Sequence, residues 1–243
     1  MTMLRLKSHS RGLGLSPRRR AARAEALSII PDGLIAEWRF DEGTGQVLTD
    51  YTGNGHHGQL GNTTGSDTAD PTWTAQGLSF DGGDRVACDN AGISGGVART
   101  LTLVVKTDSQ ARFGVEWGGT STNGSRWTLD RSAAGNLRLD IRGTIFTSTL
   151  ALPAETWCFI AATQSGADLN TVTLYLDGSA QASGTSGTID TINPLIWGQA
   201  NAVTRIMEAA YGLVYDRALS PAEVEQNRNA LKVILAARGI MLP

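Results

Sequence analysis

The sequence predicts an all-β protein, an antiparallel β-sandwich with a basic arm before it and an α-helix after it. Three observations lead to this prediction. Short apolar segments recur about every ten residues over most of the chain, which is the spacing of strands in a sandwich. Glycine, with 29 of the 243 residues, gathers with Asn, Asp and Ser between these segments, where tight turns require it. A helical period appears only near the C-terminus.

The chain divides into three predicted parts. Residues 1–32 form a basic extension, residues 33–219 a jelly-roll domain, and residues 220–243 a helix and tail. Residues 1–24 carry seven basic residues and no acidic one. Because the whole chain has 21 basic and 23 acidic residues, the remainder has 14 and 23, a balance of −9. A basic arm therefore precedes an acidic body.

The arm lacks the apolar core of a secretory signal, and no stretch of the chain is apolar enough to predict membrane insertion. We interpret residues 1–30 as an assembly arm that anchors to an acidic protein partner through Arg18, Arg19, Arg20 and Arg23. Nucleic acid is a less suitable partner because no aromatic residue is interleaved with the arginines to stack on bases. An organellar transit peptide and a solvated tail remain as alternatives.

The first predicted strand covers residues 34–40, in which apolar residues stand at alternate positions. It leads into a glycine-rich loop, residues 41–58, whose backbone must adopt conformations that other residues avoid. Oxygen-bearing side chains in such a loop also suit a hard cation such as calcium. This stretch indicates a fold more strongly than a function.

Further strands are predicted at residues 76–81 and 85–88 and then at intervals of about ten residues. The expected segments are 100–107, 112–117, 125–130, 136–141, 144–150, 157–164, 171–177, 195–198 and 207–216. Cys88 and Cys158 fall in two apolar segments. We therefore expect buried free thiols rather than a disulfide scaffold, with a single bridge as the alternative.

Two helices are expected outside the strands. A short one fits residues 21–30. The longer one begins at Ser220 as N-cap, followed by Pro221 and by Glu223, which completes a capping box. Apolar residues then repeat at helical spacing until Gly239, the expected stop; they are Val224, Leu231, Ile234 and Leu235.

Several motifs in a fixed order carry a resemblance to a known family. They are WRFDEGTG at 38–45, DYTGNG at 50–55, LSFDG at 78–82, WCF at 157–159, TLYLDG at 173–178 and VYDRALS at 214–220. This series resembles the laminin G-like, concanavalin A-like lectin-glucanase superfamily, from about residue 33 to residue 229. The resemblance implies two packed antiparallel sheets in a jelly roll, one of them concave and used to bind glycans or proteins.

The resemblance also implies a structural calcium ion with Asp50 and Asn54 as side-chain ligands. The family completes this site with an acidic pair just before the last strand. This sequence has Ala210 and Tyr211 there, with Glu208 two residues earlier. A metal-free turn held by Asx-type hydrogen bonds is therefore the alternative.

Related enzymes cleave β-glucans with carboxylates at alternate positions of one strand, in the form E-x-D-x-x-E. No such run occurs here. Glu37, Asp41 and Glu42 come closest, yet we expect Glu37 on the solvent face and Asp41 bracing the loop. The adjacent His56 and His57 point to opposite faces of an extended chain and do not predict a metal site. The protein is accordingly expected not to be an enzyme.

A glycan-binding face combines aromatic rings with polar groups, because a ring packs on the apolar side of a sugar. Trp117 and Trp127 lie in predicted mid-chain strands among polar neighbours, with core packing as the alternative for each. Arg138 and Asp140 alternate with apolar residues and should share an exposed face. We expect a glycan groove there.

Together these features predict a non-enzymatic binding, adhesion or decoration module, a phage tail or capsid accessory protein located in the virion. The jelly roll would bind surface glycans or protein partners. The arm would anchor it to other virion proteins in an oligomeric assembly. An extracellular or cell-surface location reached by a non-classical route is the alternative. A glycan-cleaving enzyme on the same scaffold and a purely structural subunit are the alternative functions.

Overall fold

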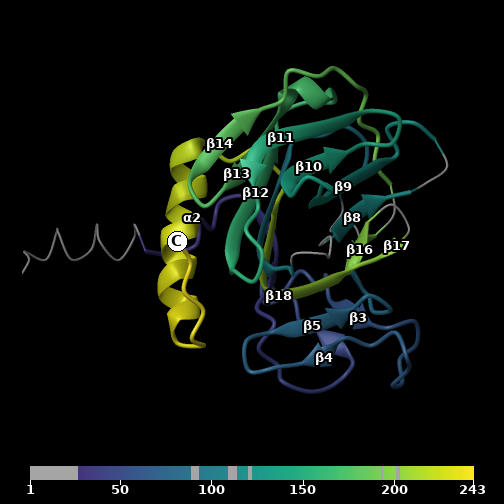
Figure 1. Cartoon of the computed structure of the whole chain (residues 1–243), viewed down its shortest axis with the longest axis vertical. Helices are drawn as coiled ribbons and strands as arrows, with labels where there is room; N and C mark the ends of the chain where they lie inside the picture. Colours follow the sequence, from purple (N-terminus) through teal and green to yellow (C-terminus); the bar gives the residue numbers. More distant parts are fainter. Residues whose placement is uncertain (1–26, 89–92, 109–113, 120–121, 193, 201–202) are drawn as a thin grey trace, which may run out of the picture.

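Two antiparallel sheets face each other in the computed structural model, which describes residues 27–88, 93–108, 114–119, 122–192, 194–200 and 203–243 (Figure 1). The strands are β1 (Leu34–Trp38), β2 (Val47–Leu48), β3 (Gly58–Leu60), β4 (Thr72–Trp73), β5 (Leu78–Asp81), β6 (Val86–Cys88), β7 (Arg99–Lys106), β8 (Gly114–Gly118), β9 (Arg126–Arg131), β10 (Asn136–Asp140), β11 (Ile145–Ala151), β12 (Cys158–Gln164), β13 (Val172–Leu176), β14 (Ser179–Ala182), β15 (Leu195–Trp197), β16 (Gln199–Ala200), β17 (Val203–Thr204) and β18 (Ile206–Tyr215).

Each of the two sheets has eight described strands. The first sheet runs β14-β13-β12-β7-β18-β5-β4, with β1 also paired to β18. The second runs β11-β10-β9-β8-β15-β6-β3-β2, and β16 and β17 form a separate hairpin. The predicted all-β sandwich with a C-terminal helix is confirmed.

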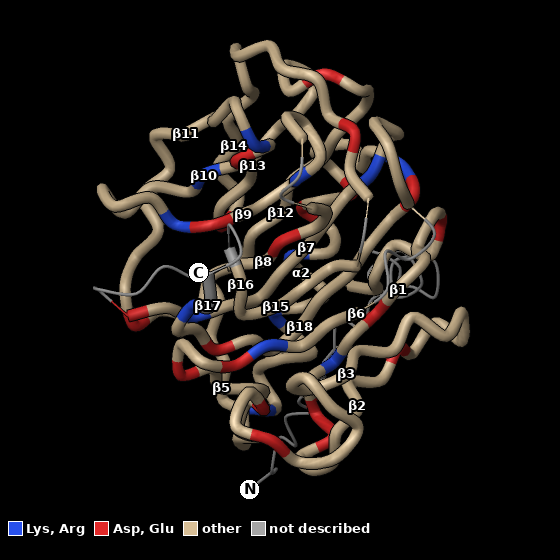
Figure 2. Tube along the Cα trace, turned by 90° about the vertical axis from the view of Figure 1, so that its right-hand side faces the viewer, with Lys and Arg blue, Asp and Glu red and all other residues tan. Residues whose placement is uncertain are grey.

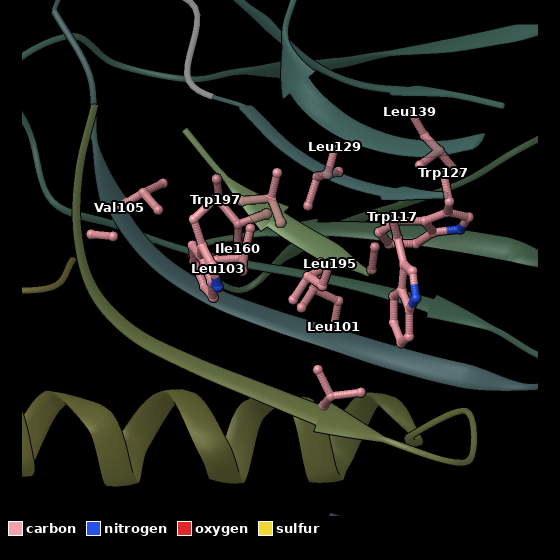
Figure 3. Packing of buried hydrophobic residues seen from close by; sticks show 14 of the residues in the cluster. Leu101, Leu103, Val105, Trp117, Trp127, Leu129, Leu139, Ile160, Leu195 and Trp197 are labelled. Atoms are coloured by element: carbon pink, nitrogen blue, oxygen red, sulfur yellow. The ribbon is translucent and has the colours of Figure 1, made fainter. Parts of the chain in front are cut away.

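Strand β7 shows how the two faces of the first sheet are used. Leu101, Leu103 and Val105 alternate into the space between the sheets, where they join Ile160 from β12 (Figure 3). Val104, at an intervening position, belongs to a second apolar cluster on the outer face of the sheet. At β7 both faces of this sheet are therefore buried.

An aromatic cluster fixes β1 against the last strand. The ring of Trp197 meets Phe40 edge-on at a centroid distance of 4.9 Å and Trp38 at 5.9 Å. Trp38 is paired across the sheet with Gly212 of β18. A side chain at Gly212 would occupy the space of the Trp197 ring, because a Cβ there would lie 2.6 Å from it.

The helix α2 (Pro221–Ala236) covers the outer face of the first sheet (Figure 1). Its predicted capping box is confirmed: Ser220 accepts from the Glu223 N–H, and the Glu223 carboxylate accepts from the Ser220 N–H. Asn227 ties the helix down, since its Oδ1 accepts from the Ile30 N–H and its Nδ2 donates to the Tyr215 hydroxyl. No helix in the described part of the chain is long and apolar enough to span a membrane.

The carboxylate of Asp50, which is 4% exposed, holds the glycine-rich loop. It accepts hydrogen bonds from the backbone N–H groups of Glu37, Thr52 and His56 and from the Thr52 hydroxyl. Burial alone raises the pKa of Asp50, but these hydrogen bonds outweigh burial and hold it below its ordinary value. Asn54 donates from Nδ2 to the Ile35 carbonyl.

This hydrogen bonding bears on the calcium site expected at Asp50 and Asn54. Donor hydrogens point at both carboxylate oxygens of Asp50. A calcium ion needs oxygens that are free to coordinate it. A calcium ion bound directly to Asp50 would therefore have to share these oxygens with the loop donors or displace some of them.

Some features differ from the sequence-based expectation. The sequence pattern missed the strands β2, β3, β4 and β14 and the β16–β17 hairpin, because two to four residues are too few to show a period of two.

Of the short helix expected at 21–30, residues 21–26 lie outside the described residues and 27–30 are not helical. Ile234, expected on the buried face of α2, is 41% exposed. Cys88 and Cys158 are buried and form no disulfide within the described chain, as predicted.

Replacing Gly212 by alanine should lower the free energy of unfolding by about 1–3 kcal/mol, the usual cost of overpacking a filled core. The added methyl group would lie 2.6 Å from Trp197 and 3.2 Å from Trp38. Urea denaturation measures the change. Gly65→Ala is the matched control, because nothing lies within 4 Å of its added Cβ. An unchanged midpoint for Gly212→Ala would show that the Trp197 ring gives way freely.

Replacing Asp50 by asparagine should destabilise the fold by about 2–4 kcal/mol at pH 7, because charge-assisted hydrogen bonds are lost and an amide N–H faces other donors. The folded-state pKa of Asp50 is depressed. The stability that Asp50 contributes is therefore fully present above about pH 4, the pKa of an aspartate in an unfolded chain. It is lost as the pH falls through the pKa of Asp50 in the folded protein. Denaturation of the wild type and of Asp50→Asn at several pH values measures how the difference between their free energies of unfolding shrinks as the pH falls.

Asp32→Asn is the control for Asp50→Asn, since the Asp32 side chain is 84% exposed. Parallel pH profiles for the wild type and Asp50→Asn would contradict the assigned role. Calcium titration of the same proteins tests the metal directly. A calcium-dependent rise in the wild-type midpoint that Asp50→Asn abolishes would show that the ion displaces the loop donors.

Candidate functional site

A pocket of about 510 Å³ lies where the end of α2 meets β1 and β18. Its polar wall consists of Glu37, Arg39, Asp41, Tyr211 and Arg238, and its apolar wall of Ile29, Ile234 and Ala237. We call it the helix-end pocket. Its residues come from both ends of the folded chain, which the pairing of β1 with β18 brings together.

Strand β1 positions Glu37 in this pocket. Ala36 and Trp38 point into the core, so Glu37 between them points to the outer face of the first sheet. Arg39 donates from Nε to Glu37 Oε1 over 2.8 Å, and the Tyr211 hydroxyl donates to the same oxygen. The side chain of Glu37 is only 12% exposed. The expectation of a solvated Glu37 is therefore wrong, because Arg39 and Tyr211 cover it.

The backbone of Phe40 brings Asp41 to the same pocket. Phe40 has φ of +54°, which is uncommon for a residue with a Cβ. Its ring enters the core, while Asp41 stays exposed and accepts from the Tyr51 hydroxyl at 3.3 Å. The guanidinium of Arg39 lies 4.2 Å from the centre of the Tyr51 ring. Contacts thus run from Asp41 through Tyr51 and Arg39 to Glu37.

Arg238 forms the wall contributed by the segment after α2. Its guanidinium donates to the backbone carbonyls of Arg39, Phe40, Gln76 and Ala210, at 3.0, 3.1, 3.3 and 2.7 Å. Burial lowers the pKa of Arg238, but a guanidinium remains a cation throughout the range in which proteins are folded. The pocket therefore has a fixed positive charge in the same wall as its carboxylates.

The protonation states in the pocket follow from these contacts. Burial, followed by the hydrogen bond to Glu37, raises the pKa of Tyr211 far above its ordinary value, so its hydroxyl stays protonated and donates. Burial lowers the pKa of Arg39, but its bond to Glu37 outweighs burial and gives a net rise. Two carboxyl groups, a fixed hydroxyl donor and an apolar wall can hold a sugar ring and transfer protons at its substituents.

The predicted sugar-stacking residues lie elsewhere. Trp117 and Trp127 are 0% exposed and pack between the sheets beside Leu129 (Figure 3). Their expected glycan-binding role is wrong, because β8 and β9 turn both side chains inward. Core packing, the alternative, is what the structure shows.

Charged residues occur in each of the neighbouring strands β8, β9 and β10 of the second sheet (Figure 2). They alternate with core residues and therefore lie on the outer face. Arg138 bonds through Nε and Nη2 to the Asp130 carboxylate, and Arg126 donates to Asp140 over 2.8 Å. The side chains of Arg138 and Asp140 are 18% and 9% exposed. The exposed groove expected at Arg138 and Asp140 is therefore wrong, because ion pairs fill that face.

Glu116 is a buried carboxylate on the same face that the sequence did not single out. Its oxygens accept from the Thr128 hydroxyl and from Gln199 Nε2, both at 3.3 Å. Gln199 belongs to the β16–β17 hairpin, so this hairpin lies over β8. Glu116 is thereby held in a closed polar layer rather than in an open site.

The geometry of the described residues gives less support to a metal site or a partner site than to the helix-end pocket. Among the described residues, no group of three or more His, Cys, Asp or Glu side chains is arranged to hold a metal ion. The anchoring residues Arg18, Arg19, Arg20 and Arg23 lie outside the described residues. Calcium binding, anchoring partners and a virion location stay predictions.

Sequence reasoning missed two residues of the helix-end pocket. Tyr211 stood out only as a replacement for an acidic ligand, and Arg238 follows the predicted helix without a recognisable motif. The one available signal was a hydroxyl-bearing ring in the apolar run AAYGLV of β18. Nothing local indicated that it faces Glu37, which is 174 residues away in the chain.

Several solved structures share this fold at low sequence identity. The sialidase of Trypanosoma rangeli matches with a TM-score of 0.63 and 15% identity, over 89% of this chain and 38% of that chain. Domain 4 of AbnA, a GH43 extracellular arabinanase from Geobacillus stearothermophilus, in complex with arabinotriose, matches with a TM-score of 0.58 and 17% identity, over 81% of this chain and 98% of that one. An arabinofuranosidase complexed with arabinofuranosyl-alpha-1,2-xylobiose matches with a TM-score of 0.58 and 13% identity, over 77% and 51% of the two chains.

These structures correct the predicted function. We expected a non-enzymatic binding, adhesion or decoration module, whereas the similar structures come from glycan-cleaving enzymes. The alternative of a glycan-cleaving enzyme fits them better. At these identities the likeness shows the fold, and this chain spans only 38% of the sialidase chain.

The family itself is shown by sequence. No curated protein sequence matches the chain. A family model described as the concanavalin A-like lectin/glucanases superfamily matches residues 80–225, more than half of the chain. The resemblance read from the sequence motifs is thereby confirmed, and the chain belongs to the concanavalin A-like lectin/glucanase superfamily.

Proposed function

We propose that this chain takes part in the enzymatic cleavage of glycans and that the helix-end pocket is where it acts. One observation carries the proposal: the pocket brings Glu37 and Asp41 to one wall, beside the fixed donors Tyr211 and Arg39. Hydrolysis of a glycosidic bond usually needs two carboxyl groups, one to donate a proton and one to assist attack. The glycosidases that share the fold support the same reaction class.

The two carboxyl groups differ in environment, which suggests different roles. Glu37 accepts from Arg39 and from Tyr211, and these donors hold its carboxylate in one position. It would activate water or stabilise positive charge on the sugar. Asp41 is exposed and accepts from the Tyr51 hydroxyl over the longer distance of 3.3 Å, so its carboxyl group faces solvent. It would protonate the leaving oxygen.

The size and walls of the pocket suit a sugar unit. A volume of about 510 Å³ is within the range of small-molecule sites in proteins. Ile29, Ile234 and Ala237 offer an apolar surface to one side of a sugar ring, and the charged wall faces its hydroxyl groups. This division also explains why Ile234 remains exposed on α2.

Glu37→Gln and Asp41→Asn should each reduce glycan hydrolysis at least about 100-fold, the usual effect of losing a general acid or base. Neither change alters side-chain size, so both variants should remain folded at the assay temperature, with a lower thermal midpoint for Glu37→Gln because the bonds from Arg39 and Tyr211 are weakened. Reducing-end release from arabinan, β-glucans and other polysaccharides, and release of sialic acid from sialosides, measure the activity. Asp32→Asn, an exposed carboxylate paired with Arg217 outside the pocket, is the control and should retain full activity.

Two outcomes would contradict the proposed function. One is hydrolysis that persists at the wild-type rate in the double variant Glu37→Gln/Asp41→Asn. The other is the absence of hydrolysis on every substrate of the panel by the wild-type chain under conditions in which it is folded.

A further inference from the structure

The interior at one end of the sandwich contains a buried cation. Arg99, at the start of β7, is 0% exposed. Its Nε donates to the Val97 carbonyl at 3.3 Å, its Nη1 to the Thr191 hydroxyl at 2.6 Å, and its Nη2 to the Gly95 carbonyl. All three acceptors are neutral.

The charge of Arg99 has no carboxylate partner among the described residues. The ion pairs of the described chain involve other arginines and Lys106. Burial lowers the pKa of Arg99 to about 10, the direction expected for a cation without an anion beside it. A buried charge is costly unless it is paired, so this position calls for a negative group.

A tryptophan with an unsatisfied donor lies beside the guanidinium. Its Cζ lies 4.9 Å from the centre of the Trp117 ring. The indole Nε1 of Trp117 is buried and, within the described chain, has no hydrogen-bond partner. The same holds for Nε1 of Trp127, which is the cross-strand neighbour of Trp117. Figure 3 shows the two indole nitrogens on the same side of this tryptophan pair.

We propose that a small monovalent anion, chloride under ordinary conditions, binds inside the sandwich between the Arg99 guanidinium and the Trp117 indole N–H. A guanidinium carries five N–H bonds, and three are used by neutral acceptors. An indole N–H is a donor only, so neither group can satisfy the other. An anion would satisfy both and compensate the charge. This site is separate from the helix-end pocket and does not depend on glycan cleavage.

A water molecule is the competing occupant. Gln164 stands opposite Arg99 in the strand pairing, and its Oε1 is a buried acceptor with no partner in the described structure. A water could donate to Gln164 and accept from Arg99. Water leaves the charge uncompensated, whereas an anion does not, and this difference can be measured.

Crystals of the full chain grown or soaked in sodium bromide should show an anomalous peak within hydrogen-bond distance of Arg99 and Trp117 Nε1. In solution, the thermal midpoint should rise with chloride at constant ionic strength, with gluconate as the replacement anion, because a ligand of the folded state stabilises it by mass action. Arg99→Met should remove this dependence. Arg131→Met, at a partly exposed arginine, is the control and should retain it.

A bromide crystal without a peak at this position, or equal midpoints in chloride and gluconate, would overturn the proposal. The wild-type measurements decide the matter even if Arg99→Met fails to fold. Asp89, which lies outside the described residues, provides a further test. If Asp89→Asn destabilises the protein as much as Arg99→Met and chloride has no effect, an aspartate supplies the counter-charge and no ion is bound.

Discussion

The packing of Trp197 against Phe40, Trp38 and the bare backbone of Gly212 is the contact on which the rest of the structure depends. It joins the two sheets and sets the register of β1 on β18. Because side chains alternate along a strand, burying Trp38 fixes Glu37 on the opposite face. The position of the pocket carboxylate is thus a consequence of how the core is filled.

The sequence contains most of the fold in local patterns. Strand β1 and the strands from β7 to β13 follow from apolar alternation and turn residues, and α2 follows from Ser220, Pro221 and Glu223. Two-residue strands such as β2 and β4 have no pattern to read. They exist because the longer strands beside them present unpaired backbone groups.

The site was harder to predict, for two physical reasons. In β9 the polar face is buried as well as the apolar one, so the sequence could not show that Arg126 and Asp130 are covered rather than exposed. Glu37 and Asp41 were recognisable as carboxylates near one another, but Tyr211 and Arg238 reach them only through strand pairing and helix docking. Contacts between residues so distant in the chain leave no trace in the spacing of a single sequence.

Arg238 has a consequence for the dynamics of the folded protein. Its guanidinium joins the segment after α2 to the turn after β1, to Gln76 in the loop before β5 and to β18. The last helical turn cannot fray without releasing four carbonyl groups and one wall of the pocket. Amide exchange in that turn and in residues 39–41 should therefore report a single opening event. The helix end and the turn after β1 should open as one cooperative unit, although they lie near opposite ends of the chain.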